Sequence, residues 1–510
     1  MGFGTVLSAA IQGIKVELIQ VEADVSNGLP MFQMVGYLSS EVKEAGDRVR
    51  TAIKNSGIDL PARKTVVNLS PATIRKRGAS FDLPIAVAVL VSAGLIVPER
   101  VKNILFVGEL GLDGKVQKVP GVLPIVMAAK AANISTCIVP VENVREGTLV
   151  EGVQVIGTKN LYEIWKCLLG EMNWQDAREF PNIEKVAKKG GVDFQDIQGQ
   201  ELVKRATEIA VAGGHNLLLV GPPGSGKSMI GRRIPTILPT MSHEESMEVT
   251  QLYSIMGLLD EHTPLITERP YRSVHHTATK AALIGGGLHP VPGEISLAHE
   301  GVLFMDELPE FPRSVIEVLR QPLEEHFIQV TRSMGSYQFP AKFMLVCAMN
   351  PCPCGGYPDY NTCTCTPFQI QQYLSKVSQP FLDRMDICVE APKVPYDVLR
   401  GREVQESSRE IKIRVSKARE RQKERYVNSE NITNATVGAI ELEKYCELGT
   451  REEELLEKAF SMLNLTARSY HKILRVARTI ADLAGAEKVQ EKHLKEAIGY
   501  RTIDKKYWGR

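Results

Sequence analysis

Hydrophobic and polar positions follow two different periods along the first part of the chain and predict mixed α/β structure. Short apolar runs within residues 1–170 predict strands, and longer amphipathic runs predict helices. The expected strands are Thr65–Leu69, Ile104–Val107 and Cys137–Val139, and the expected helices are Val42–Asn55 and Leu83–Ala93. We therefore expect a compact α/β domain over residues 1–170.

The pattern changes three times further along the chain. Residues 171–195 are polar and lack sustained periodicity, which predicts a linker. From 196 to 392, apolar strands alternate with helical segments, which predicts a parallel sheet. Beyond Pro392 the pattern is helical to the end, so residues 393–510 are expected to form a helical domain.

Composition narrows the class of protein. The chain has 510 residues, of which 44% are hydrophobic and 24% charged, which excludes collagen, bulk disorder and a disulfide-stapled miniprotein. The net charge of +1 gives no argument for binding of nucleic acid, but it does not exclude binding by a local basic patch. No run has the length of a membrane span, and the N-terminus lacks the basic region of a signal peptide. The 9 cysteines are therefore expected to be reduced thiols of a cytoplasmic protein.

A phosphate-binding loop follows the apolar run Leu217–Val220. The loop reads Gly221, Pro222, Pro223, Gly224, Ser225, Gly226, Lys227 and Ser228, and a helical stretch comes next. This is the G-x-x-x-x-G-K-S pattern in its strand–loop–helix setting. Its backbone N–H groups and the helix N-terminus favour an anion. We expect nucleotide binding, with Lys227 on the β- and γ-phosphates and Ser228 as a ligand of Mg²⁺.

A second strand brings two carboxylates to the same region. Val302–Met305 ends at Asp306 and Glu307, and parallel strands deliver such residues to the ligand crevice of an open sheet. Asp306 would hold Mg²⁺, and Glu307 would orient and polarise the attacking water. The alternative is a helix N-cap with an acidic first turn.

Two further polar residues flank later strands. Phe343–Met349 ends at Asn350, whose amide would contact the γ-phosphate or position the water. Arg384 lies between Asp383 and Asp386, just before another apolar strand. The alternative for Arg384 is a surface ion pair with one of these acids, which would stabilise little.

The order of these motifs resembles an AAA+ ATPase of the branch that contains the magnesium-chelatase ATPase subunit and the MCM helicases. Within that branch, several segments resemble the ComM/YifB family, and the resemblance as a whole covers nearly the whole chain. The segments are SVHHTAT at 273–279, GGG at 285–287, PGEISLAH at 292–299, NPCPCGG at 350–356 and LTARSYHKILRVARTIADL at 465–483.

The resemblance assigns roles to three residues. It implies that Asn350 is the sensor-1 residue and that Arg384 is an arginine finger that reaches the nucleotide of a neighbouring subunit. Arg468 matches the sensor-2 arginine on a helical lid, with Arg475 as one alternative. An arginine finger in trans requires an oligomer, and such proteins usually form hexameric rings.

Two loops of this ATPase core are candidates for contact with DNA. The long gap between Ser228 and Asp306 leaves room for an insertion around 270–298, and residues 328–339 predict a hairpin. The resemblance implies that both loops project into a central channel, where Lys280 and Arg332 would meet phosphates. The alternative is that both are ordinary exposed basic residues.

Four of the cysteines form a cluster with the pattern C-x-C-x₈-C-x-C, namely Cys352, Cys354, Cys363 and Cys365. Four thiolates on a short loop suit a tetrahedral structural zinc, although the C-x-C spacing is tighter than usual. The alternatives are four free thiols or two disulfides. A zinc ion here would fold a small knob beside Asn350 and take no part in the chemistry.

Residues 21–168 resemble the Lon protease fold, which is of the ribosomal S5 domain 2 type. Ser80, in RGASFDL, matches the segment of the Lon nucleophile, but Leu123 stands at the position of the activating lysine. Without a base the serine is a poor nucleophile, so no proteolysis is expected, unless Lys115 or Lys118 supplies a displaced base. The stretch 61–77 is basic and free of acids, and 400–425 is also basic; each suits either phosphate contact or a solvated, ion-paired surface.

Together these features predict a ring-forming, ATP-dependent DNA motor with helicase-type branch migration. The family resemblance implies a part in DNA recombination during natural transformation. The alternative is a motor like the magnesium-chelatase subunit that remodels a partner protein. A third possibility is a nucleotide-gated DNA clamp that does not translocate.

Overall fold

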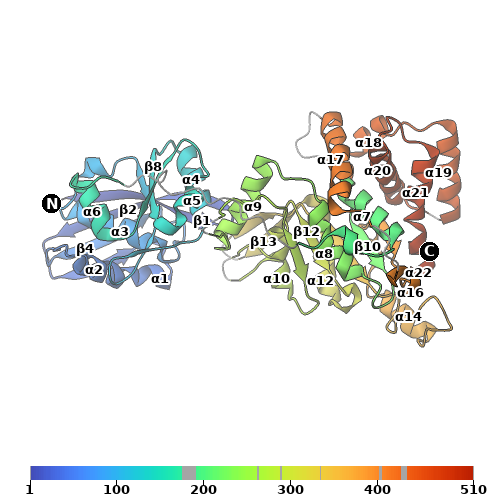
Figure 1. The fold of residues 1–510 in the computed structure, drawn as a ribbon. Coiled ribbons are helices and arrows are strands. Elements are labelled where there is room, and N and C mark those ends of the chain that lie inside the picture. Colours follow the sequence, from blue (N-terminus) through green and yellow to red (C-terminus); the bar gives the residue numbers. More distant parts are fainter. Residues whose placement is uncertain are drawn as a thin grey trace. The chain divides into compact units, whose positions relative to one another are not determined.

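The computed structural model describes residues 2–174, 191–260, 263–287, 290–332, 335–400, 405–426, 433–463 and 465–508, and the chain divides into two compact units. The first unit holds the N-terminal part of the chain together with His243–Ile266, and the second holds the remainder (Figure 1). Most of the expected linker, residues 175–190, lies outside the described residues. Among the described helices, none has both the length and the apolar character needed to cross a bilayer.

A mixed seven-stranded sheet forms the centre of the first unit, in the order β3-β4-β2-β1-β5-β8-β9. The long strands β1 and β2 pair antiparallel, and β1 also pairs in parallel with β5. The strands are β1 (Phe3–Gln12), β2 (Lys15–Ser26), β3 (Met31–Val35), β4 (Lys64–Ser70), β5 (Ile104–Phe106), β8 (Thr136–Pro140) and β9 (Gln154–Thr158), with a separate short pair β6 (Glu109–Leu110) and β7 (Val116–Gln117).

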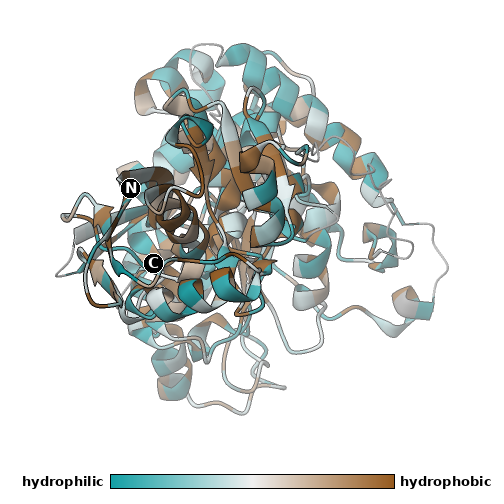
Figure 2. Ribbon diagram, turned by 90° about the vertical axis from the view of Figure 1, so that its left-hand side faces the viewer, coloured by the Kyte–Doolittle hydropathy of each residue, from teal (hydrophilic) through white to brown (hydrophobic). Residues whose placement is uncertain are grey.

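Helices pack on this sheet through apolar faces. In α3 (Asp82–Ser92) every residue is buried, which explains its continuous apolar run, and Figure 2 shows the hydrophobic colouring concentrated on central elements. The other helices of this part are α1 (Ser40–Lys43), α2 (Ala45–Asn55), α4 (Val122–Ala131), α5 (Val144–Gly147) and α6 (Leu161–Leu169).

One helix of the first unit comes from far along the chain. Helix α9 (His243–Ile255) follows the phosphate-binding region in sequence but packs against α4. Gly121 N donates to Ser254 O at 2.9 Å, and the Ser254 hydroxyl bonds to the buried carboxylate of Glu146. The first unit is therefore completed by a segment that the sequence pattern did not connect to it.

The second unit contains a five-stranded parallel sheet in the order β11-β12-β15-β10-β16, as the alternating pattern predicted. Its strands are β10 (Leu217–Val220), β11 (Tyr271–Val274), β12 (Val302–Met305), β15 (Met344–Met349) and β16 (Ile387–Glu390). The first four residues of each of β10, β12 and β15 are buried, which accounts for their uninterrupted apolar runs. Parallel pairing places the carboxyl ends of all five strands at one edge of the sheet.

Helices and a hairpin surround this sheet. The predicted hairpin is confirmed as the antiparallel pair β13 (Phe327–Arg332) and β14 (Gly335–Pro340). The helices are α7 (Glu201–Gly213), α8 (Lys227–Ile237), α10 (Lys280–Ile284), α11 (Glu294–Leu297), α12 (Arg313–Glu317), α13 (Arg320–Glu325), α14 (Pro367–Leu374) and α15 (Gln379–Leu382).

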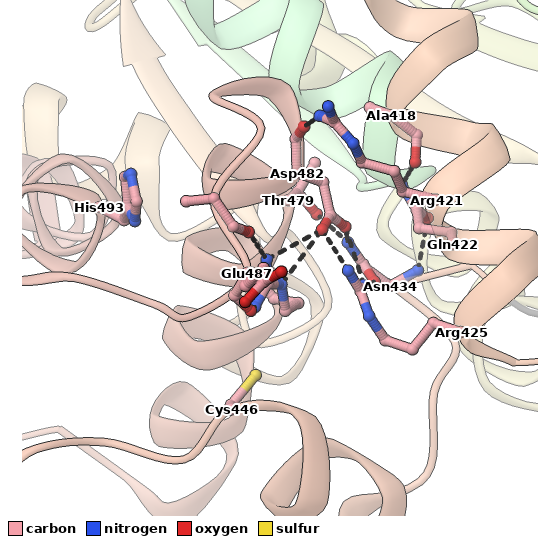
Figure 3. Close-up of polar contacts among 12 residues, drawn as sticks. Ala418, Arg421, Gln422, Arg425, Asn434, Cys446, Thr479, Asp482, Glu487 and His493 are labelled. Carbon is pink, nitrogen blue, oxygen red and sulfur yellow. Dashed lines mark hydrogen bonds and ion pairs between the residues drawn. The ribbon is translucent and has the colours of Figure 1, made fainter.

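The described part of the chain beyond β16 is helical, as predicted. The helices are α16 (Tyr396–Arg400), α17 (Ser408–Arg425), α18 (Ala439–Tyr445), α19 (Thr450–Leu463), α20 (Ala467–Leu483), α21 (Glu491–Gly499) and α22 (Thr502–Trp508). A buried network centred on Asp482 holds this region together (Figure 3). Asp482 accepts hydrogen bonds from Arg425, Arg478 and Asn434, so one carboxylate ties α17, α20 and the intervening segment to one another.

Candidate active site

The phosphate-binding loop connects β10 to α8 in the expected strand–loop–helix arrangement. Gly224 and Gly226 have φ angles of +77° and +88°, a region that favours glycine. Helix α8 begins at Lys227, so its N-terminal N–H groups and positive dipole end lie at the loop. The predicted motif thus has the backbone geometry of an anion site.

Lys227 joins this loop to the next strand of the sheet. Its ammonium Nζ donates to Gly221 O at 2.7 Å, to Pro222 O at 2.9 Å and to Asn350 Oδ1 at 3.2 Å. Burial lowers the pKa of Lys227, whereas the charges of Asp306 and Glu307 oppose that change. The residue at the end of β15 therefore lies within hydrogen-bond distance of the P-loop lysine.

The carboxylates at the end of β12 complete the group. The Ser228 hydroxyl donates to Asp306 Oδ2, and the backbone N–H of Glu307 donates to Asp306 Oδ1 at 2.9 Å. Hydroxyl and carboxylate oxygens are the donors that Mg²⁺ prefers, so this pair suits that ion. The Asp306–Ser228 bond and the exposed Glu307 side chain fit the site interpretation better than a simple helix cap.

Sequence reasoning missed a partner of Glu307. His276, just beyond the end of β11, places Nδ1 3.3 Å from Glu307 Oε2. The His276 ring also lies against that of His275, with ring centroids 4.1 Å apart. The available signal was the pair of histidines directly after a strand that neighbours β12.

A cavity of about 340 Å³ opens beside these groups. Its lining includes Glu307 and Asn350, and the remaining lining residues are Glu310, Pro353, Tyr373 and Lys376. Acidic, amide and basic side chains therefore share one concave space next to the P-loop lysine.

Arg384 and Arg468 lie together at a different place. Glu324 Oε1, on α13, lies 2.8 Å from Arg384 Nη2 and 3.6 Å from Arg468 Nη2, so Glu324 forms an ion pair with each arginine. Neither arginine hydrogen-bonds to a P-loop residue within the described part of the chain. The alternative arginine, Arg475, donates to Val437 O at 2.7 Å. Glu324 is a further residue that the sequence pattern did not single out.

The acids that flank Arg384 in sequence are not its ion-pair partners. Asp386 is buried, pairs with Lys472 at 2.9 Å and accepts from Asn216 N at 2.9 Å. Burial raises the pKa of Asp386, but the charge of Lys472 and the nearby His215 outweigh it and hold the pKa below its ordinary value. The alternative of a pair between Arg384 and Asp383 or Asp386 is therefore wrong, because Glu324 takes that place.

The four clustered cysteines converge in space. The Sγ atoms of Cys352 lie 3.4 Å from Cys354 and 3.8 Å from Cys363, and Cys354 lies 3.6 Å from Cys363. Cys365 belongs to the same group, with all four sulfurs within 4.8 Å of one another. Tetrahedral zinc with bonds of about 2.3 Å requires sulfur separations of about 3.8 Å, so the donor set fits this ion.

The chemistry of the sulfurs agrees with this fit. Cys352, Cys354, Cys363 and Cys365 form no disulfide with one another, which argues against the two disulfides considered for this loop. Tyr357 N donates to Cys352 Sγ and Gly356 N to Cys354 Sγ, both at 3.4 Å. N–H donation from Gly356 and Thr364 lowers the pKa of Cys354 to about 5, whereas desolvation raises the pKa of Cys363 and Cys365.

The candidate DNA-contacting residues lie on neighbouring loops. Arg332 at the end of β13 directs its Nε toward Gly287 O at 3.4 Å, and Lys280 is exposed at the start of α10. The hairpin and the glycine-rich segment therefore touch. Of the basic stretches, Lys76 is buried, and α17 uses Arg414 and Arg425 in ion pairs with Glu208 and Asp482.

In the N-terminal unit, the positions compared with the Lon catalytic pair have structural contacts. Ser80 accepts from Gly108 N at its backbone carbonyl, at 3.0 Å. Leu123 is fully buried, and its N–H donates to Glu146 at 2.8 Å. Lys115 pairs with Asp113 at 2.9 Å.

Comparison with protein families matches three parts of the chain. Residues 193–399 match "Magnesium chelatase, subunit ChlI", residues 21–143 match "Subunit ChlI of Mg-chelatase", and residues 405–501 match "Magnesium chelatase, subunit ChlI C-terminal". These matches cover both units.

Individual relatives extend the similarity over the full length. The competence protein ComM of Haemophilus influenzae and the protein YifB of Escherichia coli are each 41% identical over 507 residues, which is 99% of this chain and 98% of theirs. The Lon protease of Mycolicibacterium smegmatis is 26% identical over 147 residues, 28% of this chain and 18% of that protein. The predicted resemblance is confirmed, and the chain belongs to the ComM/YifB family of magnesium-chelatase-like AAA+ ATPases.

Proposed function

We propose that this protein is a ring-forming, ATP-dependent DNA motor that drives helicase-type branch migration. The observation that carries the proposal is the convergence of Lys227, Ser228, Asp306, Glu307 and Asn350 at one edge of the parallel sheet. Its DNA substrate is supported by full-length similarity to a competence protein, which points to recombination of incoming DNA during natural transformation.

The residues at the sheet edge divide the work of hydrolysis. ATP and Mg²⁺ are the cofactors that the AAA+ family implies. Lys227 binds the β- and γ-phosphates, and Ser228 with Asp306 holds Mg²⁺, which neutralises charge on the phosphates. Glu307 orients and polarises water, and Asn350 acts as sensor 1 between the water and the lysine.

Arg384, one of the two arginines on Glu324, acts on the nucleotide of a neighbouring subunit. Arg384 serves as the arginine finger and Arg468 as the sensor-2 arginine. Within the described residues, both arginines pair with Glu324 and not with the P-loop of their own chain, which supports this proposal. A finger supplied in trans accelerates phosphoryl transfer by about 10³–10⁵-fold and requires an oligomer, for which we propose a hexameric ring.

The parts of the chain take the following roles in this proposal. Residues 1–170 form a Lon-like module without proteolytic activity, residues 171–195 a linker, 196–392 the ATPase core and 393–510 a helical lid. The four cysteines hold a structural zinc, and the protein works in the cytoplasm. Lys280 and Arg332 contact DNA phosphates from adjacent loops in the ring channel.

A branch-migration assay with synthetic four-way junctions tests the motor directly. Wild type with ATP and Mg²⁺ is expected to move the junction, whereas Lys227→Ala and Arg384→Ala are expected to abolish movement. ATPase rates measured with and without forked DNA distinguish this DNA motor from the alternative, a motor that remodels a partner protein. A rate that DNA leaves unchanged, with no salt-sensitive DNA binding, would favour a chelatase-like motor on a partner protein.

Glu307→Gln distinguishes the motor from a passive clamp. A motor should bind ATP and stall on DNA, because the water is no longer activated. A nucleotide-gated clamp should keep its full effect on DNA without hydrolysis.

A further inference from the structure

The cysteine loop, residues 352–365, packs directly on the phosphate-binding loop. A Cβ atom on Gly355 would come within 2.2 Å of Pro223 Cδ, and Gly355 has a φ of +79°. Only glycine fits this approach without displacing the proline. The turn at Gly355, after the first two sulfur ligands, therefore rests on the Pro223 ring of the P-loop.

A second route connects the same loop to the reacting groups. Asn350 lies two residues before Cys352, and its Oδ1 accepts from Lys227 Nζ at 3.2 Å. Pro353, between two of the cysteines, lines the cavity that Glu307 and Asn350 share. The shape of the cysteine loop thus bears on the position of Asn350 and on the wall of the cavity.

The opposite side of the loop is also held. The ring of Tyr357 meets that of Tyr507 on α22 edge to face, with centroids 5.9 Å apart. The Tyr507 hydroxyl donates to Glu390 at the end of β16, and Trp508 Nε1 donates to Leu374 O at 3.2 Å. The loop is clamped between the P-loop and the C-terminal helix.

Apart from hydrogen bonds within the loop, such as those between Thr362 and Asp359, the loop has no hydrophobic core of its own to fix its shape. It contains no helix or strand, and most of its side chains, including Cys354 and residues 359–361, are exposed. Cys352 is its one fully buried hydrophobic side chain. In small segments of this kind, a bound metal supplies the folding free energy that a core would otherwise provide.

We propose that a zinc ion held by the four cysteines fixes this loop as a brace for the P-loop, so that metal occupancy sets the affinity for nucleotide. The proposal rests on the ATP site and the zinc ion of the proposed function, and adds that the two sites are coupled through Gly355 and Pro223. Zinc takes no part in hydrolysis; it determines whether the phosphate-binding backbone is held in place.

The test measures two quantities on the full-length protein: zinc per chain by mass spectrometry of the metal, and Kd for a fluorescent ADP analogue with Mg²⁺. Wild type is expected to hold one zinc. Cys354→Ser should lose the metal and raise Kd at least fivefold, whereas Cys167→Ser, on α6 of the other unit, should change neither.

Gly355→Ala separates the brace from the metal. It is expected to retain zinc and still raise Kd at least fivefold, because its Cβ displaces Pro223. Gly94→Ala is the matched control, since Gly94 has a similar φ of +78° and no atom within 4 Å of its added Cβ. In a Pro223→Ala background, which removes the clashing atoms, Gly355→Ala should have little further effect on Kd.

Different results would refute the coupling, the zinc site and the proposed function. Wild-type affinity in zinc-containing Gly355→Ala, or in zinc-free Cys354→Ser, would overturn the coupling while leaving the ATP site intact. A wild-type protein without metal would overturn the zinc brace. A wild type that binds no nucleotide at all would instead refute the proposed function.

Discussion

Glu307 depends on a neighbour, His276, that belongs to the segment SVHHTAT but to which the sequence pattern assigns no role. Its backbone has a φ of +52°, and its carboxylate meets His276 at 3.3 Å. His276 lies beyond the adjacent strand β11, so strand pairing brings the two together. We infer that the histidine orients the carboxylate for water activation.

Replacement of His276 by alanine is therefore expected to lower kcat roughly tenfold and to leave the Kd for nucleotide near the wild-type value. Loss of the base itself in Glu307→Gln should lower kcat at least about a hundredfold. Steady-state ATPase assays and nucleotide titrations separate the two quantities, and His276→Gln should recover part of the rate. An unchanged kcat in His276→Ala would show that the contact has no part in positioning.

Asp386 and His215 give the second unit a pH-dependent stability. The pKa of Asp386 lies below its ordinary value of 3.8, so its contribution is present above that pH and is lost as pH falls. Burial lowers the pKa of His215 below 6.5, so protonation of the unfolded chain also favours unfolding below that pH. Both groups make the folded state less stable in acid.

The corresponding variant is Asp386→Asn. It leaves Lys472 buried without its ion-pair partner, which should cost about 3–5 kcal/mol at pH 7. Calorimetric unfolding is expected to show a lower Tm for this variant at neutral pH, with the difference from wild type shrinking toward pH 3. A difference that stays constant with pH would contradict the assigned ion pair.

The positions of Asp306 and Asn350 at the sheet edge could be predicted at this scale, because each directly follows an apolar strand. Parallel strands bring such positions to one edge whatever the loops between them do. The pairing of Glu324 with Arg384 and that of His276 with Glu307 could not be predicted, because ion pairs between distant segments depend on how helices and loops pack.

At the scale of elements, the short apolar runs identified four of the five strands of the parallel sheet, since buried parallel strands carry no alternation to confuse with surface helices. The fifth strand, β11, is mostly only partly buried and lies in the expected insertion around 270–298. Helix α9 shows the limit. Most of its buried residues are polar, so its sequence carries no amphipathic pattern that would place it against α4 of the first unit. The same holds for the contact of the cysteine loop with Pro223.

The hairpin β13–β14 and the glycine-rich loop at 285–287 form one functional element in our proposal. Because Arg332 reaches Gly287 O, the two loops are expected to respond to DNA together. Arg332→Ala and Lys280→Ala should each reduce DNA-stimulated ATPase several-fold and flatten its dependence on salt, with the basal rate retained. The check is an ATPase titration with forked DNA at two salt concentrations; equal stimulation in all three proteins would remove these residues from the DNA path.

At the scale of the whole molecule, the proposed function divides the active site between two neighbouring chains. The P-loop, Asp306, Glu307 and Asn350 meet at the sheet edge, whereas Arg384 and Arg468 are held on Glu324. The family relation could be predicted from the order of motifs. The separation of these two groups within one chain required the fold.

Mixing two inactive variants tests this division. Lys227→Ala lacks phosphate binding and Arg384→Ala lacks the finger, so each alone should be nearly inactive. In a mixed ring, an Arg384→Ala subunit binds the nucleotide and a neighbouring Lys227→Ala subunit supplies Arg384. Random mixing restores every catalytic group at about a quarter of the subunit interfaces. ATPase activity should therefore rise on mixing, whereas mixing either variant with the double variant should restore nothing. If sedimentation shows mixed rings and the ATPase rate stays at background, Arg384 does not act across the subunit interface. Its role is then the structural ion pair with Glu324.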